Sequence, residues 1–125
     1  TVTGVQTCAL PIYSGIQPLQ NISVLARAAS DDAGKRAWAA HWIGTGLAAV
    51  EARLADVARE TGSDGPFALG TTVSAADMFL APQVFNAGRF GADVSSLGRC
   101  RAVFDAVMAT PWGKAAAPDA QPDAK

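Results

Sequence analysis

The sequence has few side chains that could act as nucleophiles, general acids or bases, or metal ligands, and these side chains form no cluster in the sequence. His41 is the only histidine, and neither a Ser-His-Asp set nor a Cys-His set can be assembled around it. Asp31 and Asp32 resemble a carboxylate pair for acid–base work, but their position just ahead of a helical pattern favours helix capping. Cys100 falls on an apolar helix face and is expected to be a small buried hydrophobe. Residue chemistry alone therefore predicts no catalytic residue and no metal site.

The composition indicates an all-α domain. The chain has 27 alanines but only nine aromatic residues, and alanine favours helices while contributing little to a sheet. A net charge of −1 argues against a nucleic-acid partner, which usually selects a basic surface. No apolar run approaches the roughly 18 residues of a membrane-spanning helix. Two cysteines cannot form a disulfide framework, which fits a cytoplasmic location.

Periodicity and capping signals predict four helices, at about residues 18–28, 33–61, 74–87 and 97–110, with a tail from Pro111 onward. In the second helix, apolar residues repeat with a 3.6-residue period, whereas Glu51 and its charged neighbours are expected on the solvent side. The third helix is expected to bend at Pro82, which has no N–H to donate. The apolar stripe of the second helix consists of Trp38, Trp42, Ile43, Leu47, Val50, Leu54 and Val57.

The start of the third helix carries the sharpest local signal. Ser74-Ala-Ala-Asp77 has the form of a capping box, in which the Asp77 carboxylate reaches back to the Ser74 N–H. Val73 and Met78 stand at the two positions of a hydrophobic staple. We therefore interpret Asp77 as a structural cap.

The first twelve residues differ in character from the rest. The chain begins at Thr1 rather than at a Met, and Gly4-Val-Gln-Thr-Cys-Ala-Leu-Pro-Ile12 resembles the translation of a sequencing adapter. The segment lacks the basic start and apolar core of a signal peptide. We expect residues 1–12 to be a non-native segment, residues 13–114 to be the domain and residues 115–125 to be a tail. Cys8 lies in the adapter-like run and receives no functional role.

Two longer strings give the order of these pieces a recognisable pattern. Gly15-Ile-Gln-Pro-Leu-Gln-Asn-Ile-Ser-Val-Leu25 and Ser74-Ala-Ala-Asp-Met-Phe-Leu-Ala-Pro-Gln-Val-Phe-Asn-Ala-Gly-Arg-Phe90, followed by Asp93, resemble the signatures of zeta-class glutathione transferases, the maleylacetoacetate isomerases. The closing Pro118-Asp-Ala-Gln-Pro-Asp123 is similar to the end of family members. The resemblance runs from Tyr13 to Lys125.

The resemblance implies the C-terminal helical bundle of a two-domain enzyme. The thioredoxin-like N-terminal domain, whose motif activates the glutathione thiol, is missing from the sequence. In the family, glutathione adds to the cis double bond of maleylacetoacetate, the resulting single bond rotates, and loss of the thiol gives fumarylacetoacetate.

The matching motifs carry over a small set of binding residues but no catalytic one. The first string implies a glutathione site at Gln17, Asn21, Ile22 and Ser23. The second places Arg89 at the substrate-side arginine, whose planar fork suits a dicarboxylate. The family also implies a homodimer that acts in aromatic amino-acid breakdown.

Three other functions stay open. A maleylpyruvate isomerase uses the same helical frame, and a general zeta-class transferase would conjugate glutathione to halogenated acids. A non-catalytic docking module would need no thioredoxin-like half, and it would tolerate changes at Arg89.

We predict that the chain alone has no isomerase activity and self-associates, because apolar surface meant for the absent domain and a dimer partner would be exposed. Size-exclusion chromatography with light scattering, run beside an isomerase assay, measures both properties. A monodisperse monomer with activity would contradict the prediction.

Overall fold

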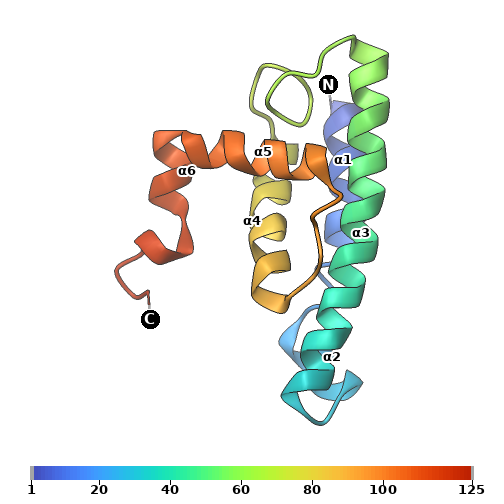
Figure 1. The fold of residues 1–125 in the computed structure, drawn as a ribbon, viewed down its shortest axis with the longest axis vertical. Helices are drawn as coiled ribbons and strands as arrows, with labels where there is room; N and C mark the ends of the chain where they lie inside the picture. Colours follow the sequence, from blue (N-terminus) through green and yellow to red (C-terminus); the bar gives the residue numbers. More distant parts are fainter. Residues whose placement is uncertain (1, 125) are drawn as a thin grey trace.

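The computed structural model describes residues 2–124 and contains helices without strands in that range. No described helix is both long enough and apolar enough to cross a membrane. The elements, shown in Figure 1, are α1 (Val2–Gly15), α2 (Ile22–Ala28), α3 (Asp32–Thr61), α4 (Ala75–Phe90), α5 (Gly98–Ala109), α6 (Pro111–Ala116) and a short 3₁₀ helix, η1 (Pro118–Ala120).

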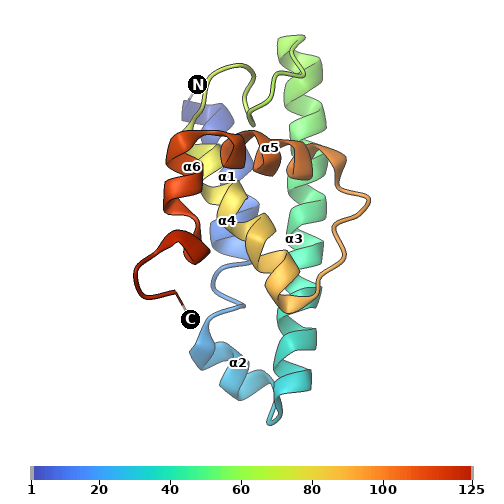
Figure 2. The ribbon, with the colours of Figure 1, turned by 60° about the vertical axis from the view of Figure 1, so that its left-hand side comes forward.

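The 30-residue α3 is the spine of the bundle. Helices α1 and α4 pack against it and against each other, α5 crosses over α3 and α4, and α2 lies beside the first turns of α3. Helix α6 packs on α5 and on η1, so the end of the chain overhangs the bundle as an arm (Figure 2). The core therefore lies among α1, α3, α4 and α5. Its largest fully buried apolar side chains are Ile12, Ile16, Ile43, Leu47, Leu80 and Val50.

The predicted apolar stripe of α3 is confirmed, with its two tryptophans at the margin. Ile43, Leu47, Val50, Leu54 and Val57 are all buried, whereas Trp38 and Trp42 are half-buried. The helix begins as predicted, because Asp31 Oδ1 accepts a hydrogen bond from the Gly34 N–H at 2.7 Å. It ends at Gly62, whose φ of 67° is favourable only for glycine.

Helix α1 contains most of the adapter-like segment. Cys8, Ala9 and Ile12 are buried in the core, and Thr1 lies outside the described residues. Close packing of α1 on α3 depends on Gly46, since a Cβ there would lie 2.2 Å from Ile16 Cγ1. The segment is thus helical and packed, while its non-native origin stays a prediction.

Six α-helices form in the described residues where the sequence predicts four, because residues 2–15 and 111–116 are also helical. The first predicted helix, in addition, starts later than expected. Pro18 lies in the turn between α1 and α2 rather than at the start of a helix, and α2 begins four residues later at Ile22. Residues 111–120, expected to be a tail that is packed on the surface or loose, form α6 and η1, and α6 packs on α5. Pro111 occupies the first turn of α6, where its missing N–H has no cost, and Thr110 Oγ1 accepts from the Gly113 N–H at 2.9 Å.

The predicted capping box at the start of α4 forms, and it does more than cap. Asp77 is fully buried. Its Oδ2 accepts from the Ser74 backbone N–H at 2.7 Å and from the Ser74 hydroxyl at 3.1 Å. Its Oδ1 accepts from the Ala68 N–H at 2.7 Å, which ties the 62–74 loop to α4. Val73 and Met78 stay 39% and 47% exposed, so the staple buries little apolar surface.

Glu51 is not on the solvent side, as the sequence pattern predicted, but at the start of α5. Helix α5 begins after Leu97, which has no side-chain acceptor for the first N–H groups. The Glu51 carboxylate replaces that acceptor, because its two oxygens accept from the Arg99 and Cys100 N–H groups at 2.9 Å each. A carboxylate at a helix N-terminus is stabilising, so this contact joins α5 to the middle of α3.

We expect Asp77→Ala to lower the free energy of unfolding by about 2–4 kcal/mol, because it removes a cap and leaves buried N–H donors unpaired. Urea unfolding followed by circular dichroism measures the loss. Asp93→Ala is the matched control: this exposed aspartate accepts from the Ser95 N–H at 2.9 Å, and its loss should cost about 1 kcal/mol or less. Equal losses for the two variants would contradict the role of Asp77.

Candidate functional site

The segment that joins α1 to α2 and the first two residues of α2 carry four of the predicted site residues. The backbone of this segment is fixed at several points. The N–H groups of Ile16 and Gln17 donate to the Ile12 carbonyl at 3.0 and 2.9 Å, which closes the end of α1. The indole N–H of Trp38, on α3, donates to the Leu19 carbonyl at 3.0 Å. The segment is therefore held on the bundle by a side chain that the sequence pattern assigned only to the core.

A reciprocal amide pair ties the same segment to α4. Gln20 Nε2 donates to Gln83 Oε1 at 3.2 Å, and Gln83 Nε2 donates to Gln20 Oε1 at 3.1 Å. Gln83 is 2% exposed. A buried side-chain amide is costly unless it is paired, so the two glutamines are stable there only together.

Three of the four predicted glutathione residues adjoin the start of α2. Asn21 is the N-cap of α2, and its Oδ1 accepts from the Ser23 N–H at 3.0 Å and from the Ser23 hydroxyl at 2.8 Å. Ile22 is 84% exposed, an unusual state for an isoleucine. Gln17 is exposed in the preceding turn. These side chains present an amide, a hydroxyl and an apolar surface on one short stretch.

Arg89 lies in the last turn of α4, at the end of the bundle where α2 lies (Figure 1). Its side chain is exposed, and its guanidinium carbon is 5.9 Å from the centre of the Phe90 ring. Arg36, on α3, donates to the Arg89 carbonyl at 3.1 Å. Among the described residues, no hydrogen bond joins Arg89 directly to the Gln17–Ser23 segment. Arg89 and the Gln17–Ser23 segment lie at the same end of the bundle. Both are attached to α4, the segment through the Gln20–Gln83 pair and Arg89 as a residue of its last turn.

The other reactive side chains have structural surroundings. Burial raises the pKa of both the Cys8 and the Cys100 thiol, which makes the reactive thiolate form scarce. His41 is exposed and packs edge-on against Trp42, with ring centres 5.0 Å apart. The described residues contain no group of three acidic, histidine or cysteine side chains able to hold a metal ion.

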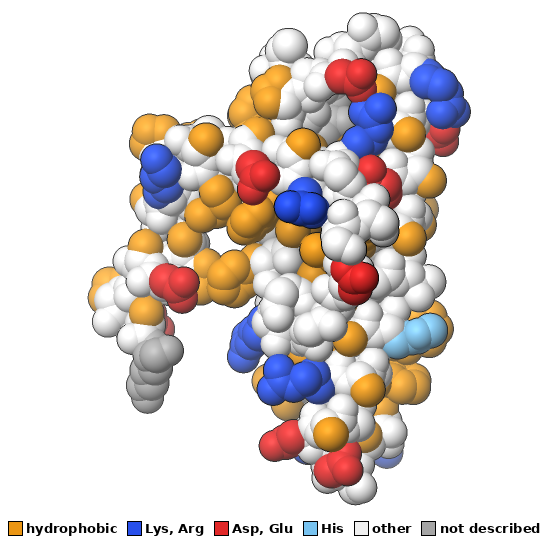
Figure 3. Space-filling view, in the orientation of Figure 1, with side chains coloured by type: hydrophobic (Ala, Val, Ile, Leu, Met, Phe, Trp, Pro, Cys, Tyr) orange, Lys and Arg blue, Asp and Glu red, His pale blue; other side chains and the backbone are white. Residues whose placement is uncertain are grey.

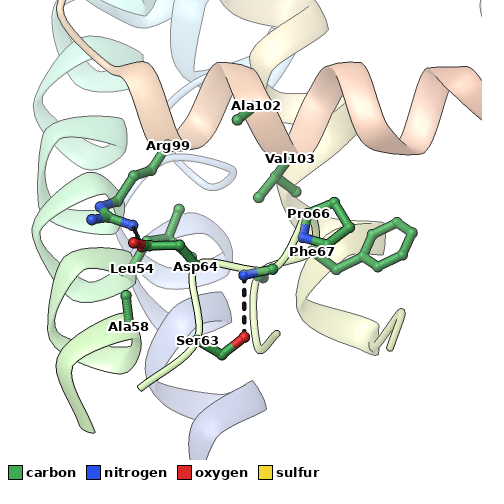
Figure 4. Close-up of a pocket in the computed structure, with 11 residues that line it drawn as sticks. Leu54, Ala58, Ser63, Asp64, Pro66, Phe67, Arg99, Ala102 and Val103 are labelled. Carbon is green, nitrogen blue, oxygen red and sulfur yellow. Dashed lines mark hydrogen bonds and ion pairs between the residues drawn. The ribbon is translucent and has the colours of Figure 1, made fainter. Parts of the chain in front are cut away.

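A pocket at the opposite end of the bundle, between the 62–74 loop and α5, contains none of the predicted site residues (Figure 4). Leu54, Pro66 and Val103 give it apolar walls. At its rim the Arg99 guanidinium pairs with the Asp64 carboxylate, so the one cation there is already neutralised. The pocket lies where the 62–74 loop packs on α3 and α5, and it contains no side chain of the predicted site.

The chain is similar in sequence and in structure to known proteins. A probable maleylacetoacetate isomerase of Drosophila melanogaster is 40% identical over 112 residues, which are 90% of this chain and 46% of that protein. The crystal structure of a maleylacetoacetate isomerase of Anaeromyxobacter dehalogenans, with bound dicarboxyethyl glutathione and citrate in its active site, superposes with a TM-score of 0.87. It is 39% identical, over 98% of this chain and 54% of that one. The chain is homologous to the helical domain of zeta-class glutathione transferases.

A second solved structure belongs to the same class. A bacterial maleylpyruvate isomerase, described as a zeta-class glutathione transferase, superposes with a TM-score of 0.88 at 34% identity and covers 98% of this chain and 58% of that one. No protein-family model matches the chain. The chain spans about half the length of the relatives it matches.

The resemblance to zeta-class motifs names the residues of the proposed site, but not the residues that hold this segment on the bundle. Trp38, Gln83 and Arg36 act across helices, so local patterns do not mark them as supports. One signal was available for Gln83: it lies three residues after Leu80 and four before Ala87, on the apolar face of α4. A glutamine on such a face indicates a buried polar contact.

We expect Gln83→Leu to loosen the Gln17–Ser23 segment, because it removes both amide bonds and leaves Gln20 unpaired. The loss of stability should be about 1–3 kcal/mol. Hydrogen exchange at the Leu19 and Gln20 amides measures the local effect, which should exceed any change at the Ala68 amide. Gln121→Leu, in the chain end that α6 carries, is the control. Unchanged exchange at Leu19 and Gln20 would contradict the role of the pair.

Proposed function

We propose that this chain is the helical half of a glutathione-dependent cis–trans isomerase that converts maleylacetoacetate to fumarylacetoacetate. The observation that carries the proposal is the combination of the Gln17–Ser23 segment and Arg89 at one end of a domain that superposes on a maleylacetoacetate isomerase. That relative was crystallised with a dicarboxyethyl glutathione in its active site, which supports a site for a thiol peptide beside a dicarboxylate.

The residues of the segment fit a polar tripeptide. Gln17 is exposed, and Asn21 uses its oxygen for capping, which leaves the donor side of its amide for a peptide carbonyl or carboxylate. Ile22 offers apolar contact area. Bound glutathione would supply the thiol whose reversible addition to the cis double bond permits rotation. The residues of this chain bind and orient, and they do not activate that thiol.

Arg89 would bind a substrate carboxylate. Its guanidinium is exposed, has no acidic partner among the described residues and can form two parallel hydrogen bonds to a carboxylate. The adjacent Phe90 ring limits where the guanidinium can lie. Substrate orientation, rather than proton transfer, is the role that these surroundings support.

The same proposal includes a thioredoxin-like half that covers the exposed apolar face of α1 and α4. Leu10, Tyr13, Met78 and Phe85 are 37–49% exposed, and the Tyr13 and Phe79 rings pack 6.0 Å apart across the two helices. Figure 3 shows hydrophobic side chains gathered where the chain end overhangs the bundle. An exposed apolar face of this kind marks an interaction surface. We further propose a homodimer in the cytoplasm.

A second candidate substrate is maleylpyruvate, because the maleylpyruvate isomerase structure superposes equally well. Both substrates carry a carboxylate beside a cis double bond, so Arg89 would act alike on either.

The test joins the thioredoxin-like half of the Anaeromyxobacter dehalogenans isomerase to the whole chain, residues 1–12 included, because Cys8, Ala9 and Ile12 are buried in the core. The fusion should isomerise maleylacetoacetate only with glutathione present, and faster than maleylpyruvate. Arg89→Gln should lower kcat/KM by about 10–100-fold, which corresponds to loss of one charge-assisted contact of roughly 1.5–3 kcal/mol.

Arg101→Gln, a change at an exposed arginine on α5, is the matched control and should leave kcat/KM within about twofold. A folded fusion that binds glutathione but isomerises neither substrate would overturn the proposal in favour of a docking module. Faster turnover of maleylpyruvate would reassign the substrate.

A further inference from the structure

A second arginine lies against the proposed substrate arginine. Arg36, in the second turn of α3, donates through one terminal nitrogen to the Arg89 carbonyl at 3.1 Å. Both side chains are exposed, and Figure 3 shows Lys and Arg side chains gathered below the end of α4. The two guanidinium groups thus belong to one surface, although 53 positions separate them in the sequence.

Within residues 2–124, neither guanidinium takes part in an ion pair with an acidic side chain. The described ion pairs use Lys35, Arg53, Arg59 and Arg99 as their cations, and Asp32, the acidic residue nearest in sequence to Arg36, pairs with Lys35. The carbonyl groups at the end of α4 favour a cation, which accounts for one of the donors of Arg36. A guanidinium has five N–H groups, so Arg36 keeps donors for a ligand.

We infer that Arg36 binds the second carboxylate of a diacid whose first carboxylate binds Arg89. The inference rests on the proposed function and names a specificity residue for it: Arg89 selects a carboxylate, and Arg36 selects a substrate with two. The hydrogen bond holds the Arg36 guanidinium beside the backbone from which the Arg89 side chain extends.

The probe pair is maleate and isocrotonate, which share a cis double bond and differ in that a methyl group replaces one carboxylate. ¹⁵N-labelled chain is titrated with each ligand by NMR at low ionic strength, because salt screens exposed charges. Wild-type chain should bind maleate more tightly than isocrotonate, with shifts at the Arg36, Arg89 and Phe90 amides.

Arg36→Gln removes the charge and keeps a side-chain amide, although the shorter side chain does not extend as far as the Arg36 terminal nitrogen that donates to the Arg89 carbonyl. It should weaken maleate binding about threefold to fivefold, as expected for an exposed ion pair, and leave isocrotonate binding unchanged. Arg36→Lys should recover part of the maleate affinity. Arg27→Gln removes a charge from α2 at the same end and should leave the preference for maleate intact.

Three results would overturn the inference: no maleate binding by the wild-type chain, equal weakening of both ligands in Arg36→Gln, or an effect of Arg27→Gln as large as that of Arg36→Gln. The first two leave Arg36 as a cap for α4 only, and the third leaves a general charge effect. The fusion assay reports separately on the proposed isomerase, because it needs glutathione and turnover whereas this titration needs neither.

Discussion

The buried carboxylate of Asp77 is the contact on which the position of α4 depends. It accepts from the backbone at Ser74 and at Ala68 at once, so it starts the helix and fixes the loop that precedes it. A fully buried carboxylate is stable only when donors surround it. The carboxylate needs these N–H donors, and the N–H groups of Ala68 and Ser74 in turn need the carboxylate as their acceptor.

By fixing the start of α4, Asp77 also helps to fix the position of the residues farther along this helix. The helix carries Gln83 in its middle, where the amide pair with Gln20 holds the Gln17–Ser23 segment, and Arg89 in its last turn. Arg36 then holds the Arg89 backbone from α3. A helix fixed at its start and held at its end fixes the backbone position from which Arg89 extends, and a fixed position favours orientation of a substrate.

Local signals in the sequence predicted what local interactions determine. The 3.6-residue stripe of α3, the Asp31 cap and the Ser74–Asp77 box involve residues within one or two turns, and the structure confirms each. The pattern of its own helix predicts Glu51 to face solvent, because no partner lies within that helix. Its hydrogen bonds to α5 form only because α5 crosses α3. The sequence around Pro18 predicts a helix start there, whereas the helix begins after Asn21, whose side chain caps it.

The candidate site divides in the same way. Gln17, Asn21, Ile22, Ser23 and Arg89 came from resemblance to family motifs, because nothing in their own chemistry or spacing forms a site. Their supports, Trp38 and Gln83, act between helices and needed the structure. In the proposed mechanism the reactive thiol belongs to glutathione, and this domain supplies binding groups alone. For that reason no reactive side chain marks the site in the sequence.

The most direct test of the account is a crystal structure of the fusion with the thioredoxin-like half, grown with glutathione and maleate. The account predicts glutathione against the Gln17–Ser23 segment and a maleate carboxylate within hydrogen-bond distance of the Arg89 guanidinium, at the α2 end of the bundle. Glutathione bound without contact to that segment, or maleate bound away from Arg89, would contradict it.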